Sequence, residues 1–297
     1  MQYSIENDIL RLTVDSHGAE PVSVIHKPTG AELLWQADPA VWKRHAPILF
    51  PYTGKLTGGK MLAKGVEYAG GQHGFARDVE HTMTHHADNL LEFELHANAE
   101  TLPKWPYAFV LRSTFTLEGE TVHHTLTVEN PVEDKLCFGI GYHPAFALPF
   151  DDRHVTEDYE IRFDGVESPL CVSAQPNGLL NGQSYYLARN VEAIQLTDDL
   201  FDNDSHAMVN LRSAHVSVIE KDTGRSVICD VSDFPYTLIW SAPKKPLHFI
   251  CIEPWHSLPG EENGPIDWEQ RPLRRDPEEG RELVHHAVHD LCPLKVR

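Results

Sequence analysis

The sequence predicts an all-β protein, a large antiparallel β-sandwich, and three observations lead to this fold class. Short segments in which apolar and polar residues alternate recur along the 297 residues. Such alternation is typical of strands with one buried face. The 21 prolines and 19 glycines are scattered between these segments, where they favour turns. No segment of about a dozen residues repeats its apolar side chains at the helical spacing.

The first half of the chain contains five clear strand patterns. We expect strands at residues 9–14, 21–26, 91–96, 109–117 and 122–130. Residues 118–120, Glu-Gly-Glu, separate the last two and are typical of a turn. Those two strands are therefore expected to pair as a hairpin.

The second half continues in the same way. We expect strands at residues 216–220, 226–231, 237–240 and 247–253, and a last strand at 281–291. The turn Asp222-Thr223-Gly224 separates the first two of these. The chain has no low-complexity linker and no repeat of fixed period, so one domain covering residues 1–297 is expected.

Composition limits the possible partners. The chain has 25 basic and 44 acidic residues, a formal net charge of −19. Such a surface repels nucleic acid and anionic membranes, so neither is an expected partner. A neutral small molecule is tolerated well. The oligomeric state cannot be deduced from these features.

The expected location is the cytoplasm. The five cysteines form no CxxC pair, which favours reduced and packed thiols. The N-terminal residues lack a basic start followed by an apolar stretch, so no signal peptide is expected. No run approaches the roughly 18 apolar residues that a membrane-spanning helix needs.

Four segments interrupt the alternation with polar or aromatic residues. They are residues 46–55 (APILFPYTGK), 73–78 (HGFARD), 141–146 (GYHPAF) and 251–256 (CIEPWH). Each combines a titratable side chain with an aromatic residue and with glycine or proline, which fix the backbone direction. Aromatic faces can stack on a sugar ring. These segments are therefore the candidate site-building parts of the chain.

The residue types in these segments favour general acid–base chemistry on a small polar molecule. Two histidines, a glutamate and two basic side chains are present, without a phosphate loop, an HExxH motif or a GxSxG motif. A glycosidase would more often need two carboxylates, and only Glu253 lies in such a segment. Each residue also has a purely structural interpretation, for example His73 in a turn or Glu253 at a strand end. The four segments together favour a site.

The combination resembles the aldose 1-epimerase family of the galactose mutarotase-like superfamily. The matching motifs are PILFPYTGKL at residues 47–56, HGFAR at 73–77, GYHPAF at 141–146 and CIEPW at 251–255. They occur in the family's order and span most of the chain. The resemblance implies a β-supersandwich and an enzyme that interconverts the α and β anomers of a free aldohexose. It implies no cofactor and no metal.

The resemblance also implies roles for individual residues. His143 matches the general acid that protonates the ring oxygen O5, and Glu253 matches the general base that takes the proton from the C1 hydroxyl. His73 matches a second histidine that hydrogen-bonds the sugar near O5. Asp204 matches an aspartate that holds sugar hydroxyls, although Asp202 fits the weaker LFDND match at 200–204 nearly as well.

Two basic residues complete the predicted substrate site, Lys55 and Arg77. Family members often carry arginine at the position of Lys55. Arginine's planar fork can hold two sugar oxygens, whereas lysine offers a point charge, so the substrate preference stays open.

Two other functions remain possible at this stage. A hexose-6-phosphate 1-epimerase shares this fold and much of the motif set. Arg77 could contact a phosphate there, but no cluster of further arginines accompanies it in the sequence. A non-catalytic sugar-binding or sensing protein could use the same pocket. The presence of both His143 and Glu253 argues against that alternative.

The many histidines predict no metal site. The pairs 85–86, 123–124 and 285–286 lie in strand-like sequence. Adjacent residues of a strand point to opposite faces, so such a pair is poorly placed to chelate one ion.

Overall fold

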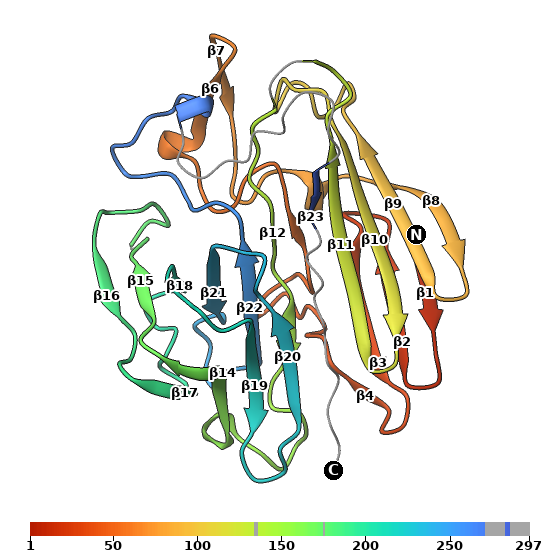
Figure 1. Cartoon of the computed structure of the whole chain (residues 1–297), viewed down its shortest axis with the longest axis vertical. Coiled ribbons are helices and arrows are strands. Elements are labelled where there is room, and N and C mark those ends of the chain that lie inside the picture. The colour runs from red at the N-terminus through yellow and green to blue at the C-terminus, as the bar shows by residue number, and fades with distance from the viewer. Residues whose placement is uncertain (134–135, 175, 271–282, 286–297) are drawn as a thin grey trace.

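Strands make up nearly all of the regular structure, as predicted. The computed structural model describes residues 1–133, 136–174, 176–270 and 283–285. In these ranges the chain forms antiparallel sheets and four short 3₁₀ turns, with no α-helix (Figure 1). No helix in these ranges is long and apolar enough to cross a membrane. The 3₁₀ turns are η1 (Thr57–Gly59), η2 (Ala76–Asp78), η3 (Thr156–Asp158) and η4 (Trp268–Gln270).

Two sheets come from the first half of the chain, apart from one strand of the second sheet, and form one side of the view in Figure 1. The first contains β1 (Gln2–Glu6), β2 (Leu10–Asp15), β3 (Glu20–His26) and β4 (Ala31–Glu32), in that order. The second runs β23-β11-β10-β9-β8 and contains β8 (Thr82–Ala87), β9 (Leu90–His96), β10 (Val110–Glu118), β11 (Thr121–Glu129) and β23 (Leu283–His285). The predicted hairpin is confirmed, because β10 and β11 pair from Val110↔Glu129 to Glu118↔Thr121.

The largest sheet has eight strands and carries the candidate site. It runs β16-β15-β18-β21-β22-β12-β5, and β13 also pairs with β22. Its strands are β5 (Ile48–Leu49), β12 (Gly141–Tyr142), β13 (Ala145–Ala147), β15 (Leu170–Val172), β16 (Ser184–Tyr186), β18 (His206–Met208), β21 (Tyr236–Trp240) and β22 (Phe249–Trp255). Three of the four motif segments therefore meet in one sheet, around β22.

The remaining strands form two smaller sheets. One runs β17-β14-β19-β20 and contains β14 (Tyr159–Glu167), β17 (Val191–Gln195), β19 (His215–Glu220) and β20 (Ser226–Asp230). The other is the hairpin of β6 (Lys60–Ala63) and β7 (Val66–Ala69). Of the predicted last strand, only Leu283–His285 is described, and the rest of 281–291 lies outside the described residues.

The core joins sheets that are far apart in the sequence. One cluster of buried side chains includes Leu12 of β2, Phe93 of β9, Phe115 of β10, Val218 of β19 and Ile252 of β22. The period-two alternation places the residues of β2, β9, β10 and β19 on the inner faces of their strands, whereas β22 is buried on both faces. Four cysteines are free and buried, which fits the predicted reduced thiols, and Cys292 lies outside the described residues.

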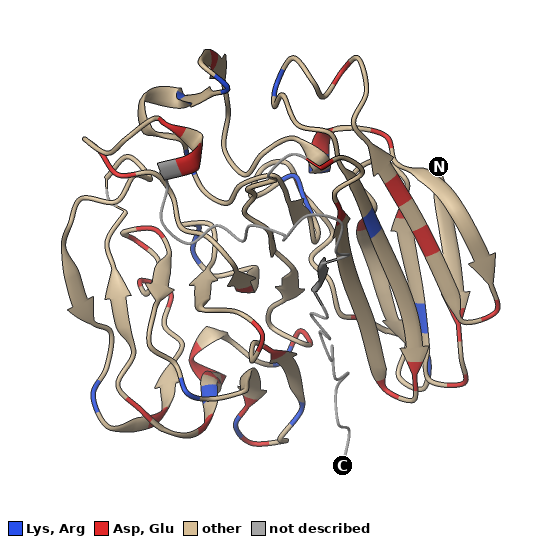
Figure 2. Cartoon of the chain, turned by 45° about the horizontal axis from the view of Figure 1, so that its top comes forward, with Lys and Arg blue, Asp and Glu red and all other residues tan. Residues whose placement is uncertain are grey.

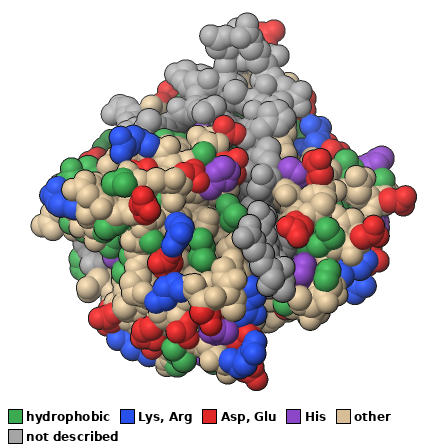
Figure 3. Space-filling model, turned by 60° about the horizontal axis from the view of Figure 1, so that its bottom comes forward, with side chains coloured by type: hydrophobic (Ala, Val, Ile, Leu, Met, Phe, Trp, Pro, Cys, Tyr) green, Lys and Arg blue, Asp and Glu red, His purple; other side chains and the backbone are tan. Residues whose placement is uncertain are grey.

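The surface carries charges of both signs. Acidic and basic residues are interspersed along the strands and turns in Figure 2. The face shown in Figure 3 likewise has acidic and basic side chains close together, and its hydrophobic side chains occur in small groups. This face therefore presents no basic stripe of the kind that a nucleic-acid backbone requires.

A buried carboxylate in β19 stabilises the β14–β19 pair through a hydrogen bond and an ion pair. Glu220, at the end of β19, is fully buried. Arg225 lies 2.5 Å from its Oε1 through Nη2, and Thr223 donates a hydrogen bond to the same oxygen. The Tyr159 hydroxyl of β14 donates to Oε2. Without Arg225, the carboxylate loses its guanidinium partner and keeps His154, whose Nδ1 lies 3.3 Å from Oε2. Loss of one partner of a buried ion pair is strongly destabilising.

We predict that Arg225→Met lowers the free energy of unfolding by about 3–5 kcal/mol, measured by urea denaturation. The matched control is Arg162→Met, because the Arg162 side chain is 54% exposed in its pair with Glu160. That control should change stability by no more than about 1 kcal/mol. Equal effects of the two substitutions would contradict the proposed importance of burial.

Candidate active site

Glu253 projects from the interior of a fully buried strand. All seven residues of β22 are buried, and the strand is paired with β21 on one side and with β12 and β13 on the other. The side chain of Glu253 keeps only 2% of its surface exposed. The strand continues two residues beyond the predicted end, to Trp255. Glu253 is therefore a buried interior residue and not an exposed strand end.

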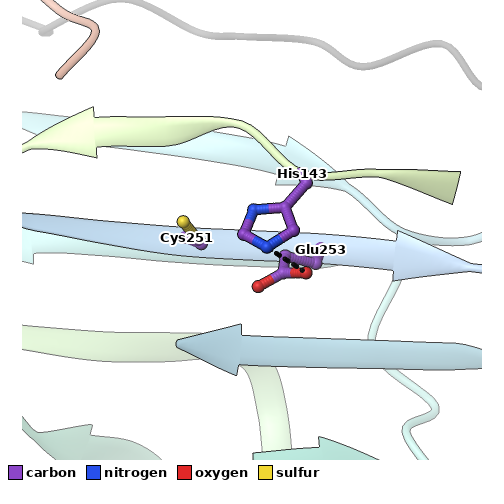
Figure 4. A group of neighbouring side chains, drawn as sticks. All are labelled: His143, Cys251 and Glu253. Carbon is purple, nitrogen blue, oxygen red and sulfur yellow. Dashed lines mark ion pairs between the residues drawn. The ribbon is translucent and has the colours of Figure 1, made fainter. Parts of the chain in front are cut away.

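His143 reaches Glu253 because β12 packs unusually close to β22. Gly141 is the register partner of Trp255, and a Cβ atom on Gly141 would lie 2.7 Å from Trp255 Cδ1. Glycine is thus required for this approach. His143 follows β12 directly, and its Nε2 lies 3.2 Å from Glu253 Oε2 (Figure 4). The predicted acid and base are in contact.

Burial disfavours charge on both members of this pair. Desolvation raises the pKa of Glu253 well above its usual value, and the charge of Asp204 adds to the effect. Desolvation lowers the pKa of His143 to about 3, and Arg77 and Arg44 contribute in the same direction. At neutral pH the two side chains therefore favour a state in which they hold one proton between them.

His73 is oriented by a tight turn. Its φ of 66° and the φ of 70° at Gly74 lie in the left-handed region, and a Cβ atom on Gly74 would lie 2.0 Å from the Phe50 carbonyl oxygen. The Gly54 amide donates a hydrogen bond of 3.0 Å to His73 Nδ1. Because Nδ1 accepts, the proton of the neutral ring is on Nε2. Burial, the largest cause, lowers the pKa of His73 well below its usual value and keeps this neutral form.

His73 therefore offers a fixed hydrogen-bond donor next to the acid–base pair. Its ring meets that of His143 edge to face, with 5.5 Å between the centroids. The side-chain amide of Gln72 is the present neighbour of His73 Nε2, with Gln72 Nε2 at 3.0 Å. Because both nitrogens carry hydrogen in this tautomer, the amide accepts from His73 only when it turns its oxygen toward Nε2. A ligand oxygen could replace the Gln72 amide at this donor.

Two arginines lie on the same side of the site. Arg77 of η2 donates a 2.7 Å hydrogen bond from Nη2 to the Gln72 carbonyl, whereas its buried Nε has no hydrogen-bond partner. Burial lowers the pKa of Arg77 to about 10, so the side chain stays cationic at neutral pH. Arg44 Nη2 lies 2.6 Å from Asp78 Oδ1. Sequence reasoning missed Arg44, although it lies just before the first motif.

The structure separates the two candidate aspartates. Asp204 is in the lining of the main cavity and follows a turn in which its amide donates to Phe201 O at 3.0 Å. Asp202 instead forms an exposed ion pair with Lys245, at 2.9 Å. Of the two, Asp204 is thus the one that could hold a ligand in the cavity.

Lys55 is not among the residues that line the cavity. Its Nζ donates a 2.6 Å hydrogen bond to the Asn177 carbonyl, and its stem packs against Gly178. Gly178 itself lines the cavity. The Lys55 ammonium group is thus engaged by a backbone carbonyl next to a lining residue, and its direct contact with a substrate stays a prediction.

Aromatic side chains surround the His143 imidazole. Trp42 stacks on the ring with 5.0 Å between centroids and an interplanar angle of 22°. Trp240 meets it at 81°, with the centroids 5.5 Å apart. Trp42 and Trp240 were not predicted as site residues. Trp42 lies four residues before the segment 46–55, and this proximity was its signal in the sequence. Trp240 faces Cys251 across the β21–β22 pair, a relation that depends on strand pairing.

These groups line a cavity of about 530 Å³, which lies within the usual range of small-molecule sites. Five of the six predicted site residues contribute to it: His143, Glu253, His73, Arg77 and Asp204. The cavity thus combines a one-proton acid–base pair, a fixed neutral donor and a carboxylate. It can move a proton between two oxygens of a small polyhydroxylated ligand.

Cys251 adds a possible ligand atom, but we assign no metal site. The ligand atoms of His143, Cys251 and Glu253 lie within 4.8 Å of one another (Figure 4). Burial raises the pKa of the Cys251 thiol well above its usual value. The thiolate is the metal-binding form, so this environment opposes coordination.

Comparison with known proteins supports the relation indicated by the motifs. The model of the family described as aldose 1-epimerase matches residues 1–265. Protein LacX (plasmid) from Lactococcus lactis subsp. lactis is 33% identical over 266 residues, which cover 87% of this chain and 88% of LacX.

Solved structures agree. A galactose mutarotase related enzyme from Lactobacillus acidophilus has a TM-score of 0.90 and 30% identity, with 98% of this chain and 99% of that chain covered. A galactose mutarotase-like protein from Lactobacillus casei ATCC 334 has the same TM-score and identity over 99% of this chain and 100% of that chain. The all-β architecture is therefore the galactose mutarotase-like fold, and the chain belongs to the aldose 1-epimerase family.

Proposed function

We propose that the chain is an aldose 1-epimerase that interconverts the α and β anomers of a free aldohexose. The contact of 3.2 Å between His143 Nε2 and Glu253 Oε2, within the cavity, is the observation that carries this proposal. The two oxygens that exchange protons in ring opening, O1 and O5, are bonded to the same carbon. An acid and a base that converge on one point match that requirement.

The reaction conserves the single proton of the pair. Transfer of this proton from Glu253 to His143 gives a carboxylate and an imidazolium ion. Glu253 takes the proton of the C1 hydroxyl, the O1 electron pair forms the aldehyde, and the C1–O5 bond breaks. The electrons of that bond go to O5, which takes the proton from His143. After rotation about C1–C2, the reverse transfers close the ring on the other face.

The neighbouring groups bind and orient the sugar. His73 donates from Nε2 to an oxygen near O5, because Gly54 occupies its Nδ1. Asp204, another residue of the cavity lining, accepts from sugar hydroxyls. Such fixed groups contribute mainly by holding the reacting atoms in register.

We predict that Glu253→Gln lowers the catalysed rate of anomer exchange by at least about 10²-fold, because the base is lost while the shape is kept. The measurement is polarimetry or proton NMR of freshly dissolved α-D-glucose and α-D-galactose, with the spontaneous rate subtracted. His143→Asn should lower turnover by a similar factor.

Two results would contradict the assignment. An unchanged rate in Glu253→Gln would remove Glu253 from the mechanism. Wild-type protein that binds the sugars without accelerating exchange would favour the sugar-binding or sensing alternative. Unchanged thermal melting of both variants is the control for folding.

The shared proton leads to a prediction about pH. A second proton is opposed by burial and by Arg77 and Arg44, which lower the pKa of His143 to about 3. Loss of the last proton is opposed by burial and Asp204, which raise the pKa of Glu253. We therefore expect kcat/KM to be flat from about pH 5 to 8, with limbs outside this range.

Asp204→Asn supplies the control for this profile. It removes a negative charge that raises the pKa of Glu253, so the alkaline limb should move to lower pH. An acid limb centred near 6.5 in the wild-type protein, the value of an ordinary histidine, would contradict the buried one-proton pair.

A second candidate function, hexose-6-phosphate 1-epimerase, is favoured by one observation. Lys43, Arg44 and Arg77 all line the cavity, although the whole chain is acidic. The buried Arg77 Nε has no hydrogen-bond partner. This local positive charge answers the main sequence-based argument against a phosphorylated substrate.

Paired substrates separate the two candidates. If a phosphate binds here, we predict that Arg77→Gln raises KM for glucose 6-phosphate by about tenfold or more while changing KM for glucose less, because charge-assisted hydrogen bonds are lost. The measurement is the rate of anomer exchange for both sugars. Equal effects on both sugars would assign Arg77 to the common sugar ring and leave the free aldose as the substrate.

A further inference from the structure

The orientation of His143 is not explained by hydrogen bonds alone. Its Nε2 faces Glu253, but its Nδ1 is buried and has no hydrogen-bond partner. A catalytic imidazole is usually held in place through its second nitrogen. Here another feature must fix the ring.

The face of Trp42 supplies that constraint. The indole stacks on the imidazole at an interplanar angle of 22° with 5.0 Å between centroids. Trp42 is itself held from two sides. Its amide donates to Asp38 O at 2.9 Å, and its carbonyl accepts a 2.8 Å hydrogen bond from Trp35 Nε1. Phe249 packs against the indole at a centroid distance of 5.4 Å.

The charges around His143 give this stacking an electrostatic role in addition to its steric one. Arg77 of η2 and Arg44 of the segment after Trp42 both oppose a positive imidazole. His73 is neutral, and Cys251 of β22 is a protonated thiol by its environment. Glu253 of β22 is the single acidic group in contact with the ring among the described residues. The face of an indole carries negative charge density and attracts a cation.

Resting on the proposed function, we propose that Trp42 is a positioning residue of the acid–base pair, which holds the His143 ring toward Glu253 and stabilises its protonated form. Trp42 does this without taking part in proton transfer. The contribution is present only when the imidazole is charged, so it favours the state that donates to O5.

Two substitutions of Trp42 separate the effect of its aromatic face from the effect of its apolar bulk. Trp42→Leu keeps apolar bulk and removes the aromatic face, whereas Trp42→Phe keeps a face. We expect Trp42→Leu to lower kcat by about tenfold, with KM changed less than about threefold, and Trp42→Phe to restore most of the loss. A rise of KM at constant kcat would instead place Trp42 on the sugar and overturn the proposal.

A readout that needs no activity comes from nitrogen NMR of the sugar-free protein. The ring-nitrogen shifts of His143, assigned by their loss in His143→Asn, report the protonation of the ring as the pH is lowered from neutrality, where the neutral ring dominates. Trp42→Leu should need a lower pH than the wild-type protein to reach the same shifts, and Trp42→Phe should lie between the two.

Unchanged shifts in Trp42→Leu, in a variant that still melts cooperatively, would overturn the proposal. The shifts could also respond as expected in a protein that does not catalyse anomer exchange. That result would refute the proposed function, but Trp42 would still orient His143 and stabilise its protonated form.

Discussion

The buried contact between His143 and Glu253 is the constraint on which the site depends. Neither group could be buried as an isolated ion, because desolvation of one charge is expensive. Sharing one proton allows both side chains to be nearly inaccessible and neutral together. The same sharing makes them chemically useful, because a small change in position moves the proton from one to the other. Burial therefore poises the pair for proton transfer, and its location in the cavity lining gives it access to a ligand.

Close backbone approach is what brings the pair together. Gly141 lets β12 lie against Trp255, and Gly74 lets the His73 turn lie against Phe50. Any side chain at either position would collide with its neighbour. Glycine weakens a strand locally, so Gly141 in β12 represents stability given up for geometry, whereas Gly74 adopts the left-handed backbone that glycine favours. The fully buried strand β22 is the base against which Gly141 approaches, whereas Gly74 approaches the backbone of Phe50 directly after β5.

The sequence was informative wherever a local pattern was sufficient. Alternation located the strands, and the hairpin β10–β11 followed from it. The motifs named five residues that line one cavity. Pattern could not distinguish Asp202 from Asp204, because only the turn after Phe201 decides which one faces the cavity. It also could not find Trp42 or Arg44, since their proximity to His143 and Arg77 depends on how separate segments pack. Lys55 matched a motif position, but its bond to Asn177 is a tertiary contact.

The cavity lining contains several basic residues although the chain as a whole is acidic. The chain has a net charge of −19, yet Lys43, Arg44 and Arg77 line the cavity that contains Glu253 and Asp204. Arg77 and Arg44 oppose protonation of His143, and Arg77 favours the ionised form of Glu253. A neutral pair that must become an ion pair needs a separate stabilising influence on the imidazole, and the indole face of Trp42 is the structural feature that lies in position to supply it.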